Sequence, residues 1–437
     1  QCLMYYYTDS VLMAPAVVSI ILAIGKVWDA VNDTLFGLIV DAVKFKSGHK
    51  FLPWLRISTI LIPLSTIALF CLNAGMSPTL KIVLAVVTYL LWDTCYTLCD
   101  APIFALPTAM TSSVKERSGF MTVGTVGGSL AAALATVFLV PYAENNGYLK
   151  AAIIVAVVSF LAMSLISLFG KERYKVKEEV LEKPASLRDT WEYLIHNKYL
   201  LYFYAYRMIS GSIAVSMLIY VAKYCLGDVK YMSMVVAISV IPICILFLFS
   251  GKIFKRFDKI VVYRFCMIAT VLMNAITLFV GYQNRTLAIA CLVVIAVLAI
   301  LPSILMGAIP QDCVEYGTYK TETRKEGITF ALQTFANKLT AAVATIITGG
   351  VLTFVGYDVA AEKAATEAHK VVEIAVSQAT VSGMWKASFI VPIIGQLLAI
   401  GFLFAYNLRD KDVQIMSDCN AGNITKAEAE ALLSRKY

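Results

Sequence analysis

Apolar runs of about 20 residues recur from one end of this chain to the other. Hydrophobic residues make up 59% of the 437 positions and charged residues 15%, whereas an ordinary globular chain is about 45–50% apolar and about 25% charged. A run of this length is what a helix needs to cross a bilayer, and a membrane barrel would instead need alternating strands of about ten residues. The sequence therefore predicts an all-α polytopic membrane protein.

The apolar runs fall into two groups. Predicted spans lie at 15–43, 54–75, 79–107, 119–141, 149–170, 197–222, 231–251, 260–282, 287–311, 327–355 and 384–407. Residues 1–9 are expected to end a further span that begins before Gln1. We predict two six-helix bundles over 1–170 and 197–408, a charged cytoplasmic linker over 171–196, and a polar cytoplasmic tail over 409–437.

A weak internal repeat supports this division. Basic turns follow Gly37 and Gly251 at corresponding places in the two groups. Parallel repeats of this kind occur in major-facilitator proteins.

Basic residues are concentrated in alternate loops. Residues 44–56, 115–117, 171–177, 252–259 and 320–325 carry them, whereas the loop over 72–80 has none. The positive-inside rule places the basic loops in the cytoplasm, so we predict a multi-pass membrane protein with these loops on its cytoplasmic side. This distribution explains the net charge of +8, so the charge does not indicate nucleic-acid binding. We find no nucleic-acid-binding motif.

Carboxylates inside two of the apolar runs point to function. Asp29 and Asp33 are one helical turn apart and share a helix face with Asn32. A later run repeats the theme with Asp93 and Asp100 on either side of Thr97. An acid in hydrocarbon is costly, and its default interpretation is an ion or proton pathway.

The mixture of oxygen ligands favours a small cation. Carboxylate, amide and hydroxyl oxygens suit a hard ion, so we predict a site for Na⁺, or Li⁺, made by Asp29, Asn32, Asp33, Thr97 and Asp100. A proton is the open alternative, although a proton relay has no need of the amide and the hydroxyl. A second alternative is structural, in which the acids pair with Lys26, Lys338 or Arg207 and only hold helices together.

Further side chains are candidates for binding a substrate. Lys338 lies deep in a predicted span, where a cation needs an acidic partner, and Arg207 lies about ten residues into its own span. Tyr96 and Phe104 offer rings for stacking, although aromatic residues more often pack or form interface belts. The tyrosines at 5–7 are expected at the outer interface.

The chain carries no arrangement typical of an enzyme. Its histidines, His49, His196 and His369, fall in predicted loops. We find no Ser/His/Asp set, HExxH motif or glycine-rich phosphate loop. We therefore expect neither an enzyme nor a bound cofactor beyond the coupling ion.

Four motifs resemble those of one family. They are Tyr5-Tyr-Tyr-Thr-Asp9, Trp28-Asp29-Ala-Val-Asn32-Asp33, Asp100-Ala-Pro102 and Asp312-Cys-Val-Glu315-Tyr-Gly317. They are similar to motifs of the glycoside–pentoside–hexuronide:cation symporters, and the resemblance covers nearly the whole chain. It implies a major-facilitator fold whose halves rock around a site near the midplane.

The resemblance also implies roles for single residues. The five cation residues named above match the family's cation-site positions, and Asp100 would also touch the sugar. Gln333, Thr334 and Lys338 match the C-terminal side of the substrate cavity, and Lys26 matches a basic position beside the cation. The gate residues, with a structural role at the cytoplasmic end, would be Gly37, Asp41, Lys44 and Lys50.

Several positions depart from the family's pattern. Phe104 and Ser303 stand where the family has tryptophans, and Thr125 stands where it has an arginine. The family's sugar-binding acid of the first helix would precede Gln1, and Asp93 replaces a small residue. These departures affect the sugar more than the cation, and Arg207 is the candidate for the missing guanidinium.

From these features and this resemblance we predict a Na⁺-coupled symporter that moves a sugar or glycoside across a bacterial inner (plasma) membrane. We expect it to be a monomer in the bilayer. The alternative on the same fold is a H⁺-coupled carrier of a sugar acid or a lipid-like solute. A receptor or scaffold that does not transport is a third hypothesis, which the intramembrane acids disfavour.

Overall fold

The computed structural model describes residues 2–43, 45, 48–111, 114–172, 193–195, 197–322, 326–357 and 376–435. Throughout these residues the regular structure is helical, without a strand. Among them, ten helices are long and apolar enough to cross a membrane. The predicted all-α polytopic class is therefore confirmed.

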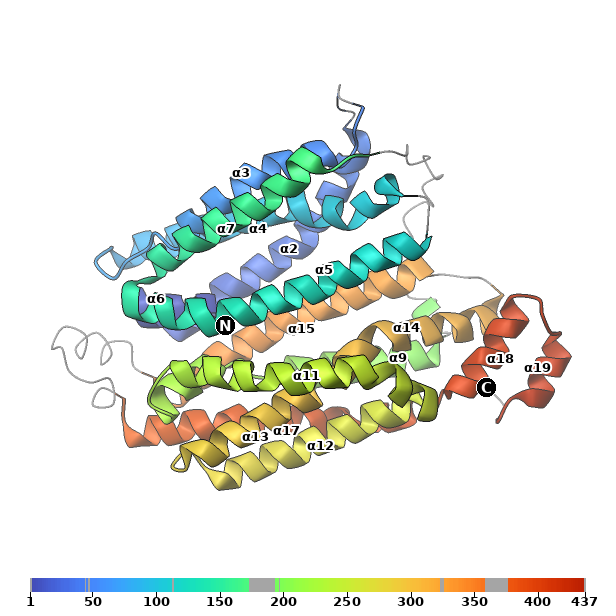
Figure 1. Ribbon diagram of the computed structural model, residues 1–437. Helices are drawn as coiled ribbons and strands as arrows, with labels where there is room; N and C mark the ends of the chain where they lie inside the picture. Colours follow the sequence, from blue (N-terminus) through green and yellow to red (C-terminus); the bar gives the residue numbers. More distant parts are fainter. Residues whose placement is uncertain are drawn as a thin grey trace. The chain divides into compact units, whose positions relative to one another are not determined.

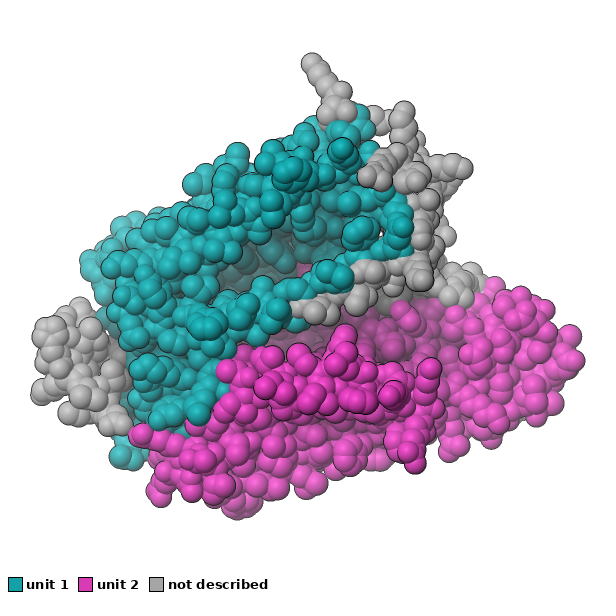
Figure 2. Space-filling view, in the orientation of Figure 1, with its two compact units in different colours: residues 1–180, 216–234, 348–384 teal, residues 181–215, 235–347, 385–437 magenta. Residues whose placement is uncertain are grey.

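The chain divides into two compact units, shown in different colours in Figure 2. The first unit comprises residues 1–180, 216–234 and 348–384, and the second comprises 181–215, 235–347 and 385–437. The chain thus passes from one unit to the other several times. The bundles predicted over 1–170 and 197–408 stay a prediction.

The first unit contains most of the N-terminal helices, drawn from blue to green in Figure 1. They are α1 (Cys2–Tyr5), the π-helical turn η1 (Tyr6–Ser10), α2 (Pro15–Ala42), α3 (Leu52–Leu69), α4 (Pro78–Met110), α5 (Val114–Leu134), η2 (Ala135–Leu139), α6 (Val140–Asn146), α7 (Tyr148–Phe169), α10 (Leu218–Tyr220) and η3 (Val221–Cys225). Helix α3 packs against α4 and α7, and α2 packs against α4. Phe36, Leu55 and Leu106 are buried together in this packing.

Helices α2 and α4 meet closely where Gly25 faces Tyr89. A Cβ atom at position 25 would lie 2.0 Å from Cε1 of Tyr89, and the Tyr89 ring is buried. A residue without a side chain lets two membrane helices approach in this way. Asp29 and Asp93 lie one turn further along their helices, so the close crossing brings the acid-bearing stretches together.

The second unit holds the remaining long helices and the end of the chain. They are α9 (Lys198–Ser212), α11 (Lys230–Arg256), α12 (Lys259–Val280), α13 (Arg285–Leu298), α14 (Ile300–Thr321), α15 (Glu326–Phe354), α17 (Gln378–Ala405), α18 (Asp410–Asn420) and α19 (Lys426–Leu432). The first residues of α11 and α17 and the last of α15 belong to the first unit. Aromatic rings of Tyr199, Phe203, Tyr263 and Tyr406 pack edge to face in its core.

The span predicted over 197–222 is broken. Helix α9 ends at Ser212, residues 213–217 are not helical, and helix resumes at Leu218. The break follows Gly211 and Ser212, and such Gly/Ser pairs are known sites of sharp kinks. The backbone N–H of Ser216, freed from the helix, donates to Oγ1 of Thr348 at 3.1 Å.

The predicted polar tail contains two helices. Helices α18 and α19 form within 409–437, and α18 packs on α14. Asn420 of α18 donates to the backbone carbonyl and to the carboxylate of Glu315, at 3.0 and 2.9 Å. Residues 173–192 and 196 of the predicted linker lie outside the described residues.

The prediction for the tyrosines at 5–7 was wrong. All three are at most 3% exposed, and rings of Tyr5 and Tyr6 pack against Tyr148. The hydroxyl of Tyr6 donates to the carbonyl of Leu72 at 2.6 Å. A tyrosine whose hydroxyl finds a partner is as suited to burial as to an interface belt.

Candidate functional site

Side chains of α2 and α4 meet in a buried polar cluster. Nδ2 of Asn32 donates to Oγ1 of Thr97 at 2.9 Å. The Thr97 hydroxyl lies 3.3 Å from Oδ1 of Asp33 and 3.1 Å from the backbone carbonyl of Asp93. Asn32 and Thr97 are 8% and 2% exposed. Three of the five predicted cation residues therefore lie within hydrogen-bond distance of one another, with Thr97 in the middle.

The Thr97 hydroxyl has two acceptors within reach and one hydrogen. It therefore donates either to Asp33 or to the Asp93 carbonyl, while its lone pairs face Asn32 and one further partner. If the hydrogen points to the carbonyl, the oxygens of Thr97 and Asp33 both present lone pairs to the same place. That arrangement can ligate a small cation.

Two more carboxylates flank this cluster. Oδ2 of Asp29 lies 3.9 Å from Nζ of Lys26, one turn earlier on the same helix. Asp93 is 3% exposed and one turn before Thr97. The predicted cation set omitted Asp93, although a carboxylate inside an apolar run is the signal that selected the other acids.

Asp100 lies between two exposed rings on α4. Tyr96, Asp100 and Phe104 follow at intervals of four residues, so they share one helix face. Tyr96 and Phe104 are 44% and 58% exposed, and the Tyr96 hydroxyl interacts with the Asp100 carboxylate. The Tyr96 ring stacks on Trp92 with 5.5 Å between ring centroids. A carboxylate flanked by open rings can bind a sugar through hydrogen bonds and stacking.

The remaining predicted substrate residues belong to the second unit. Arg207 lies on α9 next to Tyr263. Gln333, on α15, donates to the carbonyl of Met306 at 3.0 Å. On the same helix, Thr334 is exposed and Lys338 is half-buried. The predicted site residues thus form two sets, one in each unit.

The predicted gate residues are described only in part. Lys44 lies outside the described residues, and only the backbone is described for Gly37 and Asp41. The backbone N–H of Lys50 donates to Oε2 of Glu172 at 2.7 Å. The next two backbone N–H groups donate to Oε1 of the same carboxylate, which therefore caps the start of α3.

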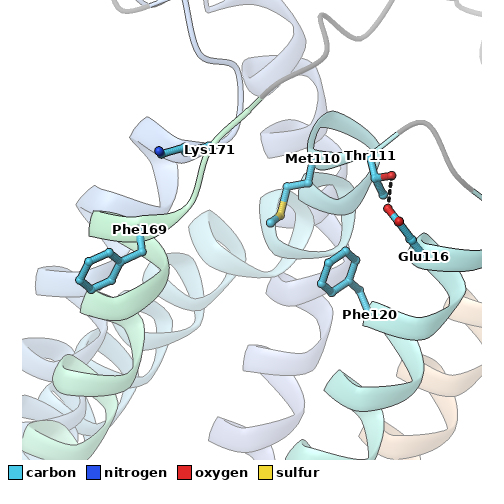
Figure 3. A pocket seen from close by; sticks show the side chains of 6 residues that line it. All are labelled: Met110, Thr111, Glu116, Phe120, Phe169 and Lys171. Atoms are coloured by element: carbon cyan, nitrogen blue, oxygen red, sulfur yellow. Dashed lines mark hydrogen bonds between the residues drawn. The ribbon is translucent and has the colours of Figure 1, made fainter.

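A cavity of about 320 Å³ in the first unit lies away from these residues (Figure 3). Met110, Thr111, Glu116, Phe120, Phe169 and Lys171 line it. Met110 is ten residues beyond Asp100, which is about 15 Å along a helix. The Thr111 hydroxyl donates to Glu116 at 2.5 Å across one side. The cavity lies at the end that the charge pattern predicts to be cytoplasmic, and it is no part of the polar cluster.

Comparisons with known proteins cover nearly the whole chain. The family described as MFS/sugar transport protein matches residues 2–410. A putative sulfoquinovose importer of Escherichia coli is 26% identical over 94% of this chain and 86% of its own length. An isoprimeverose transporter of Lactiplantibacillus pentosus is 23% identical over 95% and 86%.

A solved structure supports the fold. The inward-facing, unoccupied crystal structure of a bacterial homologue of the human lysosomal transporter Spinster aligns with a TM-score of 0.60. It is 13% identical and covers 92% of this chain and 95% of its own. At this identity the similarity concerns the fold, which is the predicted major-facilitator fold.

Proposed function

Because this chain belongs to the MFS/sugar transport protein family, and is therefore a multi-pass membrane transporter rather than an enzyme, we propose that it is a Na⁺-coupled symporter of a sugar or glycoside. Asp29, Asn32, Asp33, Thr97 and Asp100 hold the ion, and Li⁺ replaces it. The supporting observation is the hydrogen-bonded meeting of Asn32, Thr97 and Asp33 from two helices. The protein acts as a monomer in a bacterial inner membrane, with its basic loops in the cytoplasm.

The coupling follows from charge. Two carboxylates about 4 Å apart repel by about 4 kcal/mol at an effective dielectric of about 20. A bound cation relieves this repulsion. If the sugar binds Asp100 beside Tyr96 and Phe104, ion and sugar stabilise one arrangement of α4 together. A coupling free energy of about 1–3 kcal/mol gives a change of about 5–150-fold in affinity, which is enough for symport.

The substrate is proposed to be a glycoside or a related sugar. Relatives are named for sulfoquinovose and isoprimeverose, and both are sugars or sugar derivatives. We further propose that Gln333, Thr334, Lys338 and Arg207 of the second unit bind the substrate. The two cationic side chains would suit hydroxyl groups or an anionic substituent. We propose that transport proceeds by alternating access, as in other major-facilitator transporters.

Uptake in proteoliposomes tests the proposal. With a Na⁺ gradient, vesicles that contain unaltered protein accumulate the labelled sugar. Asp33→Asn removes the Na⁺ stimulation, because a neutral amide does not compensate for the free energy of dehydrating the ion. Asp228→Asn is the matched control, since Asp228 is an exposed acid far along the chain, paired with Lys230 at 3.3 Å. Na⁺ stimulation that persists in Asp33→Asn would exclude the proposed ion site.

A H⁺-coupled carrier of a sugar acid or a lipid-like solute is the second candidate. Asp93 favours it, because a carboxylate that is 3% exposed within a membrane helix is the kind of residue from which proton relays are built. The same vesicles distinguish the two. A pH gradient without Na⁺ would then drive accumulation, and Asp93→Asn would abolish it.

A further inference from the structure

A second buried ion cluster lies in the first unit, at the end opposite the basic loops. The ammonium group of Lys223, in η3, contacts the carboxylate of Asp9, in η1, and lies 3.3 Å from Oε1 of Glu144, in α6. The three side chains are 12%, 6% and 27% exposed. Tyr224 and Tyr357 both donate to Oδ1 of Asp9. We call these five residues the Asp9 cluster.

Tyrosines complete the surroundings of the cluster. Tyr5 donates to Glu144 at 3.1 Å, and Tyr148 donates to it at 3.3 Å. The Lys223 ammonium also lies 5.2 Å from the centroid of the Tyr5 ring, within reach of a cation–π interaction. Each charged group therefore has several partners, as a buried ion network requires.

The cluster joins parts of the chain that have different neighbours. Asp9 and Glu144 belong to the continuous stretch 1–180, whereas Lys223, Tyr224 and Tyr357 lie in the short segments 216–234 and 348–384. The described chain that flanks these segments belongs to the second unit. One segment begins at the helix break after Ser212, where a change in direction is already built in.

Two further contacts hold the same segments in place. The hydroxyls of Thr8 and Tyr220 lie 2.6 Å apart. Gly349 packs on Ser19 so closely that a Cβ at 349 would lie 2.4 Å from the Ser19 Cβ. Ser19 is consequently 2% exposed. Any outward movement of residues 348–357 would uncover it.

The chemistry of these contacts suits an interface that opens. Ions and hydroxyl groups exchange their partners for water when they separate. The free energy lost on separation is therefore smaller than for an apolar surface of equal area. The loops beside the cluster, 72–80 and 142–150, are poor in basic residues, which predicts that this end faces away from the cytoplasm.

We propose that the Asp9 cluster is a latch that holds residues 216–234 and 348–357 against η1 and α6. In this proposal the latch closes the extracytoplasmic end and opens once in each transport cycle. The proposal rests on transport as the function, but on neither the ion nor the sugar. It makes Lys223 the central residue, since its ammonium group contacts both carboxylates.

Accessibility of a reporter thiol tests the latch. Ser19→Cys places a thiol behind the closed contact, and Met110→Cys places one in the cavity at the other end. A membrane-impermeant thiol reagent is applied to reconstituted protein, from either side, and modification is quantified at each position by peptide mass spectrometry. Because modification is read at each peptide separately, labelling of the native cysteines does not affect the rates measured at positions 19 and 110.

Lys223→Gln is expected to raise the rate at position 19 several-fold and to lower the rate at position 110. Tyr357→Phe removes one hydrogen bond to Asp9 and should give a smaller rise. Lys230→Gln is the matched control, because Lys230 pairs with Asp228 while 66% exposed. An unchanged rate at position 19 would overturn the proposal. A rise at both positions would also overturn it, since the cluster would then support the fold rather than a gate.

The labelling needs no sugar and no Na⁺ gradient. Failure of the Na⁺-coupled uptake experiment therefore leaves its outcome intact, and failure of the labelling leaves the ion site intact.

Discussion

Gly25→Ala is expected to weaken Na⁺ binding without touching a ligand. The new Cβ would lie 2.0 Å from Cε1 of Tyr89 and 2.6 Å from Cδ1, whereas carbon atoms pack at about 3.5–4.0 Å. The Tyr89 ring is 5% exposed and has little room to turn. Helix α2 must therefore move away from α4, which separates Asn32 and Asp33 from Thr97.

The size of the effect follows from two opposing terms. Alanine in place of glycine in a helix gains about 0.5–1 kcal/mol, and overpacking a core costs about 1–3 kcal/mol. With so large an overlap we take the upper end of the cost, about 3 kcal/mol, so the net loss of stability is about 2 kcal/mol. The control Gly127→Ala meets no atom within 4 Å and should instead gain about 0.5–1 kcal/mol.

Thermal unfolding of purified protein with and without Na⁺ measures both the loss of stability and the loss of Na⁺ affinity. A ligand at about 100 times its Kd stabilises by about 2.7 kcal/mol, and a tenfold loss of affinity removes about 1.4 kcal/mol of this. Gly25→Ala should lower Tm and shrink the Na⁺-dependent shift, and Gly25→Ala with Tyr89→Leu should restore part of both. Equal behaviour of Gly25→Ala and Gly127→Ala would refute the reasoning.

Three further predictions concern other contacts. Thr97→Val should lower the affinity for Na⁺ about tenfold, as expected for the loss of a hydrogen bond or ligand to a charged group. Thr97→Ser should keep the affinity, and titration of the Na⁺-dependent Tm shift measures both variants. Lys259→Met should destabilise the second unit by about 3 kcal/mol and lower Tm, because it leaves the carboxylate of Asp312 without the Lys259 ammonium group, whose Nζ lies 2.6 Å away. The control Lys426→Met removes an exposed ion pair and should leave Tm unchanged. Burial raises the pKa of Asp410, so docking of α18 is favoured at acidic pH and weakens as the pH rises through that pKa. Hydrogen-exchange protection factors of α18 should therefore fall toward neutral pH, and those of the Asp410→Asn variant serve as the comparison.

The sequence was sufficient for the helical class and for much of one helix face. Asp29, Asn32 and Asp33 share a face because of their spacing alone. Their meeting with Thr97 depends on the distance between two helices, which spacing does not determine. The contact of Gly25 with Tyr89 sets that distance, and a single glycine in an apolar run carries no visible partner.

The Asp9 cluster was missed for a related reason. Lys223 lies in an apolar run, which is the same signal that selected Asp29, but its partners are more than 70 residues away in sequence. The tyrosines beside it were assigned to an interface on composition. The break after Ser212 was also invisible to a hydropathy argument, because residues 213–221 remain apolar across it.

The Thr97 hydroxyl is the side chain that separates the two candidate coupling ions. A proton needs one carboxylate, and a carboxyl group that carries the proton can donate to whatever oxygen or water is near. A Na⁺ ion must recover the hydration it loses from several oxygens at once. Thr97 presents a lone pair beside the Asp33 carboxylate when its hydrogen points to the Asp93 carbonyl, 3.1 Å away. Removal of this hydroxyl therefore has unequal consequences: it takes a ligand from a Na⁺ ion, whereas a proton-coupled protein retains its titrating carboxylate. Preserved pH-driven uptake in Thr97→Val with lost Na⁺-driven uptake would assign the hydroxyl to the metal ion.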